Sequence, residues 1–334
     1  MNPTSDPSAG ELVPAGHNLP SSFPSQLPSI VARAGKAAVF AADEFFYGRI
    51  RNERTRAAYL IAVRRFLKWA EECGLELVRI TPKDVGQYID GLRKENTSVA
   101  TRKQHLAAIR HFFDGLVTRH AILLNPALSV RGERYEVVEG KTPEMTIEGA
   151  RKLLASIDTS TAVGLRDRAI VAILIYTASR AGAVAKLKRG SFYHAGDQWT
   201  LHFDEKGGKS REIPVRHDLE QMLFEYLDAA SLRNARKDTP LFRTAYRKTG
   251  KLTKNSVDVV DVCRMVKRRL KDASLPSRLS PHSFRVTTIT DLLEQGVPLE
   301  DVQRLAGHAD PRTTRLYDRR QKKITRNIVE RISI

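Results

Sequence analysis

The sequence predicts a mainly helical protein with a small β-hairpin or sheet, that is, an α+β fold in two domains. Three observations support this prediction. Apolar residues recur at helical spacing over most of the chain. Only around one pair of glycines is every second residue apolar, as in a β-strand. The chain has 334 residues, of which 41% are hydrophobic, and this is enough to bury two separate cores.

Residues 1–32 are predicted to form a disordered leader. The first 30 residues contain six of the 15 prolines and six serines, no lysine or arginine, and no apolar periodicity. A secretory signal would need a charged start followed by an apolar core, and neither is present. No stretch of the chain is apolar enough to span a bilayer, so we expect a cytoplasmic protein without membrane association.

Residues 33–128 are predicted to form a small all-helical domain. A fourth helix around residues 39–46 is expected beside three helices that show clear apolar stripes. These stripes are Tyr59, Val63, Phe66, Leu67 and Ala70; Val85, Tyr88, Ile89 and Leu92; and Leu106, Ile109, Phe113 and Leu116. Thr81 and Pro82 are typical of a helix start, because the hydroxyl can cap backbone amides and proline suits the first helical position.

Residues 129–145 are predicted to be an interdomain linker, because they are largely polar and charged and show little apolar periodicity. The second domain, residues 146–334, is expected to open with a helix capped by Thr146. Glu148 would lie in its first turn, near the positive end of the helix dipole. A nearly continuous apolar run at residues 169–176 is typical of a buried helix.

A β-hairpin is predicted on either side of Gly207 and Gly208, with Lys206 at its tip. Apolar residues alternate with polar ones in both flanks, at Trp199, Leu201 and Phe203 before the glycines and at Ile213 and Val215 after them. Helical patterns then resume. In the tail, Ile324, Ile328 and Ile332 would form an apolar stripe on a final helix.

Basic residues are concentrated in the second half of the chain. The formal net charge is +18, of which residues 1–150 carry +3 and residues 151–334 carry +15. A surface of this charge favours a polyanion such as nucleic acid, although charge alone is equally compatible with a soluble basic protein. Cys73 and Cys263 are far apart and lack neighbouring metal ligands, so we expect small core residues and no disulfide or zinc site.

Six residues form a candidate active site for phosphodiester chemistry without a metal: Arg180, Lys206, His282, Arg285, His308 and Tyr317. The two guanidiniums can neutralise the non-bridging oxygens of a phosphate, because their planar forks match its geometry. A phenol can attack phosphorus and stay bonded to it, while ammonium and imidazole groups can move protons or hold oxygens. Taken singly, each residue also has an ordinary structural explanation, such as a helix-end charge, a turn lysine or a core tyrosine.

The segment from Ser280 to Arg285 gives the most specific local signal. Ser280 can cap a helix, Pro281 suits its first position, and His282 and Arg285 then lie three residues apart on one face. Both side chains would project from the N-terminus of the helix, where the dipole favours an anion.

The ordered combination resembles the tyrosine recombinase or phage integrase family, whose signature is Arg, Lys, His-x-x-Arg, His or Trp, and then Tyr. The resemblance covers nearly everything after the leader. It is closest in Leu305-Ala306-Gly307-His308, in the nine-residue step from there to Tyr317, and in Lys206-Gly207-Gly208-Lys209 running into Ile213-Pro214. Family members commonly carry a glycine two residues before the first arginine and an acidic residue three after it, where this chain has Ala178 and Ala183.

The resemblance implies a site-specific DNA recombinase or integrase that acts through a 3′-phosphotyrosyl intermediate. Tyr317 would attack the scissile phosphate, and Arg180, Arg285 and His308 would stabilise the charge that develops on its oxygens. The 5′ hydroxyl of a partner strand would then attack the phosphotyrosine and rejoin the DNA.

The resemblance also assigns the proton transfers. Lys206 would protonate the departing 5′ oxygen, and His282 would accept the phenolic proton. Because the energy of the phosphodiester bond is kept in the intermediate, neither ATP nor a metal nor any other cofactor is expected.

A C-shaped clamp around double-stranded DNA is implied as well, with residues 33–128 on one side of the duplex and the catalytic domain on the other. The family assembles homotetramers on paired sites, and accessory DNA-bending proteins remain open as further partners; the protein would act at the nucleoid. Two alternatives remain, a non-catalytic DNA-binding protein on the same scaffold and a type IB-like topoisomerase. The separate helical domain and the apolar tail favour recombination, because strand exchange needs partner subunits.

Overall fold

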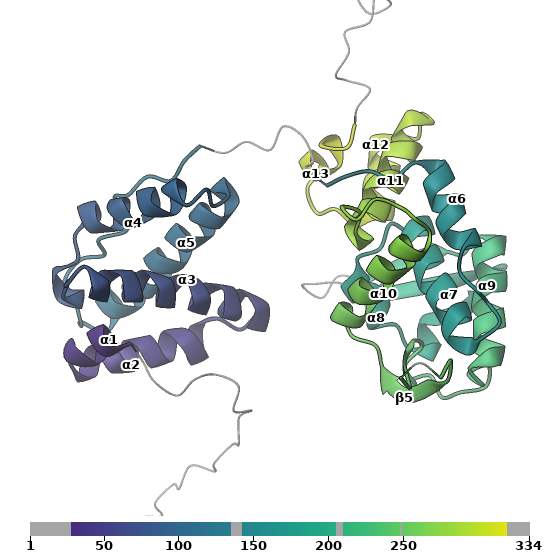
Figure 1. Cartoon of the computed structure of the whole chain (residues 1–334), viewed down its shortest axis with the longest axis horizontal. Coiled ribbons are helices and arrows are strands. Elements are labelled where there is room, and N and C mark those ends of the chain that lie inside the picture. The colour runs from purple at the N-terminus through teal and green to yellow at the C-terminus, as the bar shows by residue number, and fades with distance from the viewer. Residues whose placement is uncertain (1–27, 135–141, 205–209, 248, 319–334) are drawn as a thin grey trace, which may run out of the picture. The chain divides into compact units, whose positions relative to one another are not determined.

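The computed structural model describes residues 28–134, 142–204, 210–247 and 249–318 (Figure 1). The chain forms two compact units, Met1–Glu136 and Val137–Ile334, each with its own hydrophobic core. The described segments are mainly helical, with a three-stranded and a two-stranded antiparallel sheet in the second unit, which confirms the predicted fold class. In these segments every helix is too short or too polar to cross a membrane.

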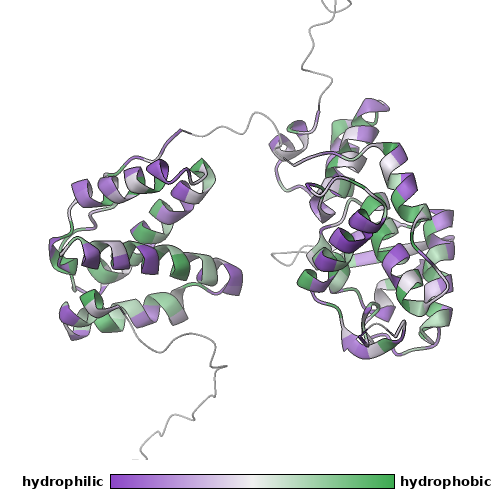
Figure 2. Cartoon of the chain, in the orientation of Figure 1, coloured by the Kyte–Doolittle hydropathy of each residue, from purple (hydrophilic) through white to green (hydrophobic). Residues whose placement is uncertain are grey.

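All the regular secondary structure in the described residues of the first unit is helical. Its elements are α1 (Ser29–Arg33), α2 (Lys36–Glu44), the π-helical turn η1 (Phe45–Arg49), α3 (Glu53–Glu72), the 3-10 turn η2 (Leu77–Arg79), α4 (Pro82–Lys94) and α5 (Val99–Thr118). Hydrophilic and hydrophobic residues alternate along these helices (Figure 2), as expected when one face of each packs on a shared core.

Aromatic side chains from α3, α4 and α5 fill the core of the first unit. Phe66 of α3 meets Tyr88 of α4 and Phe113 of α5 edge to face, with ring centroids 5.1 Å and 6.0 Å away. The predicted start of α4 is confirmed, since the Asp84 amide donates to the Thr81 hydroxyl at 3.4 Å and the Thr81 amide donates to the Asp84 carboxylate at 2.8 Å.

Two predictions about this unit are wrong. The leader was expected to extend to residue 32, but α1 begins at Ser29 and buries Ile30 and Val31 in the core. A five-residue helix is too short to show a period in sequence. Cys73, which was expected in a core, is exposed directly after the end of α3. Cys263 of the second unit, for which the same was expected, is half-buried.

The second unit contains most of the candidate site. Its elements are α6 (Ile147–Ala155), α7 (Ala162–Tyr176), α8 (Ala181–Ala185), the 3-10 turn η3 (Arg189–Ser191), β1 (Phe192–Ala195), β2 (Gln198–Asp204), β3 (Ser210–Pro214), α9 (His217–Ala229), β4 (Arg243–Ala245), β5 (Leu252–Ser256), α10 (Val259–Asp272), α11 (Pro281–Glu294), α12 (Leu299–Ala306) and α13 (Pro311–Arg315). The predicted cap of α6 is present, since the Gly149 amide donates to the Thr146 hydroxyl at 3.0 Å. The three tail isoleucines, Ile324, Ile328 and Ile332, lie outside the described residues.

The sheet β1-β2-β3 confirms the predicted hairpin. Strands β2 and β3 pair antiparallel, with Leu201 opposite Ile213 and Phe203 opposite Arg211. The apolar members of these pairs are buried, so the alternation read from the sequence marks the inner face of the sheet. The tip that carries Lys206 lies outside the described residues.

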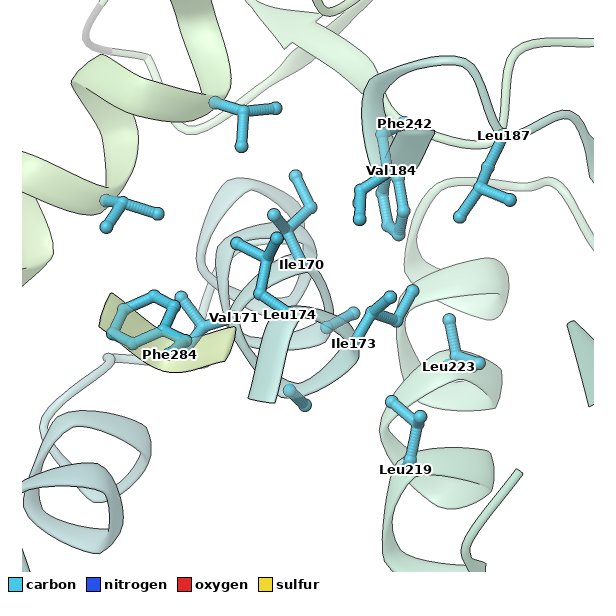
Figure 3. Close-up of a cluster of buried hydrophobic side chains, with 14 of the residues drawn as sticks. Ile170, Val171, Ile173, Leu174, Val184, Leu187, Leu219, Leu223, Phe242 and Phe284 are labelled. Carbon is cyan, nitrogen blue, oxygen red and sulfur yellow. The ribbon is translucent and has the colours of Figure 1, made fainter. Parts of the chain in front are cut away.

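Helix α7 is the centre of the second core. Every residue from Ala169 to Leu174 is buried, because neighbouring helices cover α7 on several sides. Figure 3 shows Ile173 turned toward Leu219 and Leu223 of α9, and Phe284 of α11 beside α7. Because α8 and the residues before it follow directly from α7, this packing determines where Arg180 is placed.

A buried carboxylate links α7 to α10. Asp167 is fully buried and accepts from Arg166 at 2.6 Å and from Arg268 and Arg269 at 2.8 Å. Three guanidiniums therefore compensate one carboxylate that has been removed from water.

Candidate active site

Five of the six predicted residues lie at ends of elements in the second unit. Arg180 directly precedes α8, His282 and Arg285 belong to the first turns of α11, and His308 and Tyr317 flank α13. Lys206 lies outside the described residues, so the structure gives no position for it. Figure 1 shows α11, α12 and α13 close to one another. These helices follow α8 by about 100 residues of chain.

The segment leading to Arg180 has an uncommon backbone. Ala178 has φ +48°, in the left-handed region that glycine adopts without strain, and it is fully buried. Next to it, the Thr177 hydroxyl donates to the Ile173 carbonyl at 2.6 Å, and its oxygen lies 2.7 Å from the Ser179 hydroxyl oxygen. The chain thus turns sharply out of the buried helix and presents Arg180 at the surface.

Arg285 is the largest fully buried side chain of the described residues. Its guanidinium donates to the carbonyl of Ala178 and, at 2.5 Å, to the carbonyl of Ala306. Arg285 therefore ties α11 to the segment before Arg180 and to the end of α12. These bonds hold a permanent positive charge in a buried position.

His282 lies on the first turn of α11. The predicted capping segment is present, although the observed bond runs from the Ser280 amide to the Ser283 hydroxyl at 3.1 Å. The His282 side chain is exposed at its edge, yet surrounding atoms remove enough water to lower its pKa, and the charges of Arg285 and Arg180 lower it further. An uncharged imidazole at neutral pH can accept a proton.

His308 is buried immediately after the end of α12. Gly307 ends that helix with φ +62°, and the Gln303 side chain donates to the His308 carbonyl at 3.0 Å. The His308 Nδ1 atom lies 2.9 Å from the Thr314 hydroxyl oxygen. One imidazole nitrogen is therefore engaged, and Nε2 is the nitrogen left to meet a substrate.

Burial lowers the pKa of His308 to about 3, and four neighbouring groups add to this effect. They are Arg285, Arg180, His282 and Arg211, each of which disfavours a further positive charge. The same two arginines, Arg180 and Arg285, also act on His282. Four residues of the predicted site, Arg180, His282, Arg285 and His308, are thus brought into one neighbourhood from three separate parts of the chain.

Tyr317 lies two residues beyond α13. The Asp310 carboxylate caps that helix by accepting a hydrogen bond from the Arg312 amide at 2.9 Å. The Tyr317 ring stacks nearly parallel to the His308 ring, with an angle of 7° and a centroid distance of 5.9 Å. It also packs beside a small apolar cluster formed by Ala178 and residues of α11 and α12.

Sequence reasoning missed Thr314 and Arg211. Thr314 is fully buried and lies three residues before Tyr317, so helical spacing could have indicated that its hydroxyl faces the same neighbourhood. Arg211 lies five residues after Lys206 in the second strand of the hairpin. Its contacts depend on strand register and tertiary packing, which no local pattern reveals.

The arrangement defines a class of protein. Arg180 and Arg285 act electrostatically on His282 and His308, and the Tyr317 ring stacks on that of His308, within a unit of net positive charge. Guanidinium, imidazole and phenol are groups that suit chemistry on a phosphate. Residues 144–323 match the sequence pattern described as "Phage integrase family", and residues 44–122 match "Phage integrase, N-terminal SAM-like domain". The chain belongs to the phage integrase family of tyrosine recombinases, enzymes that cut and rejoin DNA.

Characterised relatives and solved structures agree with this membership. The chain is 30% identical over 237 residues to tyrosine recombinase XerD of Listeria monocytogenes serotype 4b (strain F2365), covering 70% of this chain and 76% of that protein. Its fold is similar to the XerH site-specific recombinase bound to difH DNA in a post-cleavage complex, with a TM-score of 0.66, 21% identity and coverage of 82% and 80%. It is also similar to a lambda integrase tetramer bound to a Holliday junction, with a TM-score of 0.60, 17% identity and coverage of 89% and 78%.

Proposed function

We propose that this recombinase cuts DNA by attack of Tyr317 on a phosphodiester, forming a 3′-phosphotyrosyl intermediate. The observation that carries the proposal is the stacking of Tyr317 on His308 within the reach of the Arg180 and Arg285 charges. In the attack, the Tyr317 Oη–P bond forms and the bond between phosphorus and the 5′ oxygen breaks. The two arginines stabilise the negative charge that builds up on the non-bridging oxygens.

The proton transfers of the reaction fall to the remaining residues. The pKa of His282 lies below its usual value, so this imidazole is uncharged at neutral pH and accepts the phenolic proton. Lys206 gives a proton to the departing 5′ oxygen. A 5′ hydroxyl then attacks the phosphotyrosine, and the same groups run the transfers in reverse.

His308 takes part as a neutral hydrogen-bond donor. With a pKa of about 3 it carries no charge at physiological pH. If the Thr314 hydroxyl donates to Nδ1, the single proton of the ring lies on Nε2, where it can bond a phosphate oxygen. His308 thus contributes a directed hydrogen bond to a phosphate oxygen, whereas the two arginines contribute positive charge.

The partners that we propose are double-stranded DNA and three further copies of this chain. The solved relatives include DNA complexes and a tetramer on a Holliday junction, and a basic second unit fits a polyanion. Strand exchange between two duplexes requires four active sites, which a homotetramer on paired sites supplies. The place of action would then be the nucleoid in the cytoplasm, and DNA-bending proteins are a further class of partner.

Covalent trapping tests the proposal. Bound duplexes would be selected from a random pool, and the recovered site would be nicked near the cleavage position so that the released end diffuses away. We expect a protein-DNA adduct on a denaturing gel, with the DNA remnant located on Tyr317 by mass spectrometry. Tyr317→Phe should abolish the adduct, whereas Tyr246→Phe, which removes an exposed hydroxyl of the same unit, should leave it unchanged.

Binding without an adduct in the unaltered protein would contradict the proposed chemistry and would favour a DNA-binding protein on the same scaffold. A second assay separates recombination from topoisomerase activity. A plasmid with two selected sites should yield joint products, whereas relaxation of supercoils without joint products would identify a topoisomerase.

A further inference from the structure

Arg211 contacts the segment that leads into Arg180. From β3, its guanidinium donates to the Ser179 hydroxyl at 3.0 Å and lies 3.5 Å from the Thr177 carbonyl. It also lies over the ring of Phe203, with the guanidinium carbon 5.5 Å from the ring centroid. The guanidinium therefore lies between the Phe203 ring and the turn that joins α7 to α8.

Two guanidiniums from separate elements thus hold three consecutive residues. Arg211 of β3 holds Thr177 and Ser179, and Arg285 of α11 holds the carbonyl of Ala178 between them. All three residues of the turn are at least 99% buried. The position of Arg180 follows from this turn, because Arg180 is the next residue.

The turn has a physical need for such support. Ala178 is strained at φ +48°, and a strained residue keeps its conformation only when its surroundings enforce it. The acidic residue that the family commonly has three positions after Arg180 is absent, since Ala183 stands there. Arg211 supplies bonds to this region that do not depend on that carboxylate.

We propose that Arg211 is a positioning residue of the active site, which fixes the turn before Arg180 and adds positive charge around His308. This inference rests on the proposed function. Arg211 acts on the phosphate through Arg180 and His308 rather than by touching the reacting atoms. Its permanent charge acts on His308 together with those of Arg285 and Arg180, and all three favour the neutral imidazole.

The test compares Arg211→Met with Arg211→Lys and with a matched control. Arg216→Met is the control, because Arg216 also lies over an aromatic ring, 4.6 Å from the centroid of Tyr176, but its guanidinium pairs with half-buried Asp218 rather than with the turn at residues 177–179. Single-turnover adduct formation on the nicked DNA would be measured at saturating protein, so that weaker binding does not enter the rate. The pKa of His308 would be followed in the free protein by NMR of labelled imidazole.

We expect Arg211→Met to slow adduct formation by up to about 100-fold and to raise the pKa of His308 toward its ordinary value. The rate of adduct formation of Arg211→Lys should lie between those of the unaltered protein and Arg211→Met, because an ammonium keeps the charge but lacks the planar fork that reaches two acceptors. Arg216→Met should leave both measurements unchanged. In a Ser179→Ala background Arg211→Met should reduce the rate by a smaller factor, since the Ser179 hydroxyl that accepts from Arg211 is already absent.

A folded Arg211→Met protein with an unchanged rate and an unchanged His308 titration would overturn the inference. If that variant does not fold, the comparison of Arg211→Lys with Ser179→Ala decides, since full rates in both would also overturn it. Absence of an adduct in the unaltered protein would instead count against the proposed function. The His308 titration would still test the effect of the Arg211 charge.

Discussion

Ala178 departs from the family pattern at a position where the backbone favours glycine. Its φ of +48° costs a residue with a Cβ atom about 1 kcal/mol relative to glycine, which is common at this position in the family. We therefore expect Ala178→Gly to raise the free energy of unfolding of the second unit by about 1 kcal/mol. Urea unfolding followed by Trp199 fluorescence in a Trp69→Phe background would measure it, because the chain has two tryptophans, one in each unit.

Ala229→Gly serves as the control for this substitution. Ala229 is exposed in the last turn of α9, so glycine there should destabilise by up to about 1 kcal/mol. Equal losses in both variants would show that the backbone at residue 178 relaxes into an ordinary conformation in solution.

Thr314 matters through its hydroxyl, which lies 2.9 Å from His308 Nδ1. Thr314→Val keeps the shape and removes the bond, so the imidazole loses its preferred tautomer. We expect the rate of adduct formation to fall by roughly tenfold, in line with the size of a single hydrogen bond. Thr314→Ser, which keeps the hydroxyl, should retain most of the rate; a serine variant as slow as the valine variant would assign Thr314 to packing alone.

The burial of His308 also predicts how stability depends on pH. Its pKa of about 3 in the folded protein lies below the ordinary value of about 6.5, so only the unfolded chain takes up this proton as the pH falls through that range. The stabilisation is complete above about pH 6.5 and is lost progressively toward pH 3. Between about pH 6.5 and 5 the loss is on the order of 2 kcal/mol.

A His308→Gln variant isolates this effect, because glutamine does not titrate. The difference in unfolding free energy between the unaltered protein and the variant should shrink as the pH falls from about 7 to 5, as measured by urea unfolding with Trp199 as the reporter. A difference that stays constant with pH would mean that the folded protein takes up the proton as readily as the unfolded chain.

At the scale of elements, Asp167 is the strongest link between α7 and α10. Asp167→Asn removes the buried negative charge and leaves the buried Arg166 guanidinium without its ion pair, while Arg269 keeps only Asp272 at 3.7 Å; we expect a loss of about 3–5 kcal/mol in the stability of the second unit. Asp238→Asn breaks an exposed pair with Arg236 and should cost less than about 1 kcal/mol. Similar losses in the two variants, again followed through Trp199, would show that the buried cluster is not a specific link.

Elements marked by local signals were predictable from the sequence. The caps at Thr81 and Thr146 involve residues three positions apart, and the alternation of apolar residues from Trp199 to Val215 indicates the hairpin. Such patterns act within one element, so they can be read without knowing what packs against it.

Features that depend on contacts between distant elements were not predictable. Arg211 acquires its role only when β3 lies against the turn after α7, and α1 is helical because Ile30 and Val31 reach a core built from residues further along the chain. The positive φ of Ala178 is likewise imposed by packing against α11 and α12, since alanine alone would avoid it. The six candidate residues were named from their order in the chain, whereas the electrostatic coupling of Arg180 and Arg285 with His282 and His308 emerged only from the fold.

At the scale of the whole molecule, the two units differ most in charge. Residues 1–136 contain 19 basic and 14 acidic residues, a net of +5, and residues 137–334 contain 37 and 24, a net of +13. Each lysine or arginine that neutralises a DNA phosphate releases counterions, so binding weakens with salt in proportion to the number of such contacts. The second unit should therefore show the steeper dependence of DNA affinity on salt concentration.

Because each unit has its own core, the two can be prepared as separate proteins and compared on one duplex. For residues 137–334 we expect the affinity to fall by about 10³-fold or more between about 50 and 200 mM salt, as for six or more neutralised phosphates, and by much less for residues 1–136. Fluorescence anisotropy of a labelled duplex would measure both slopes. Equal slopes would mean that the first unit presents its basic residues on one DNA-facing surface despite its small net charge. The local arrangement of basic residues, rather than the net charge of a unit, would then determine how this recombinase binds DNA.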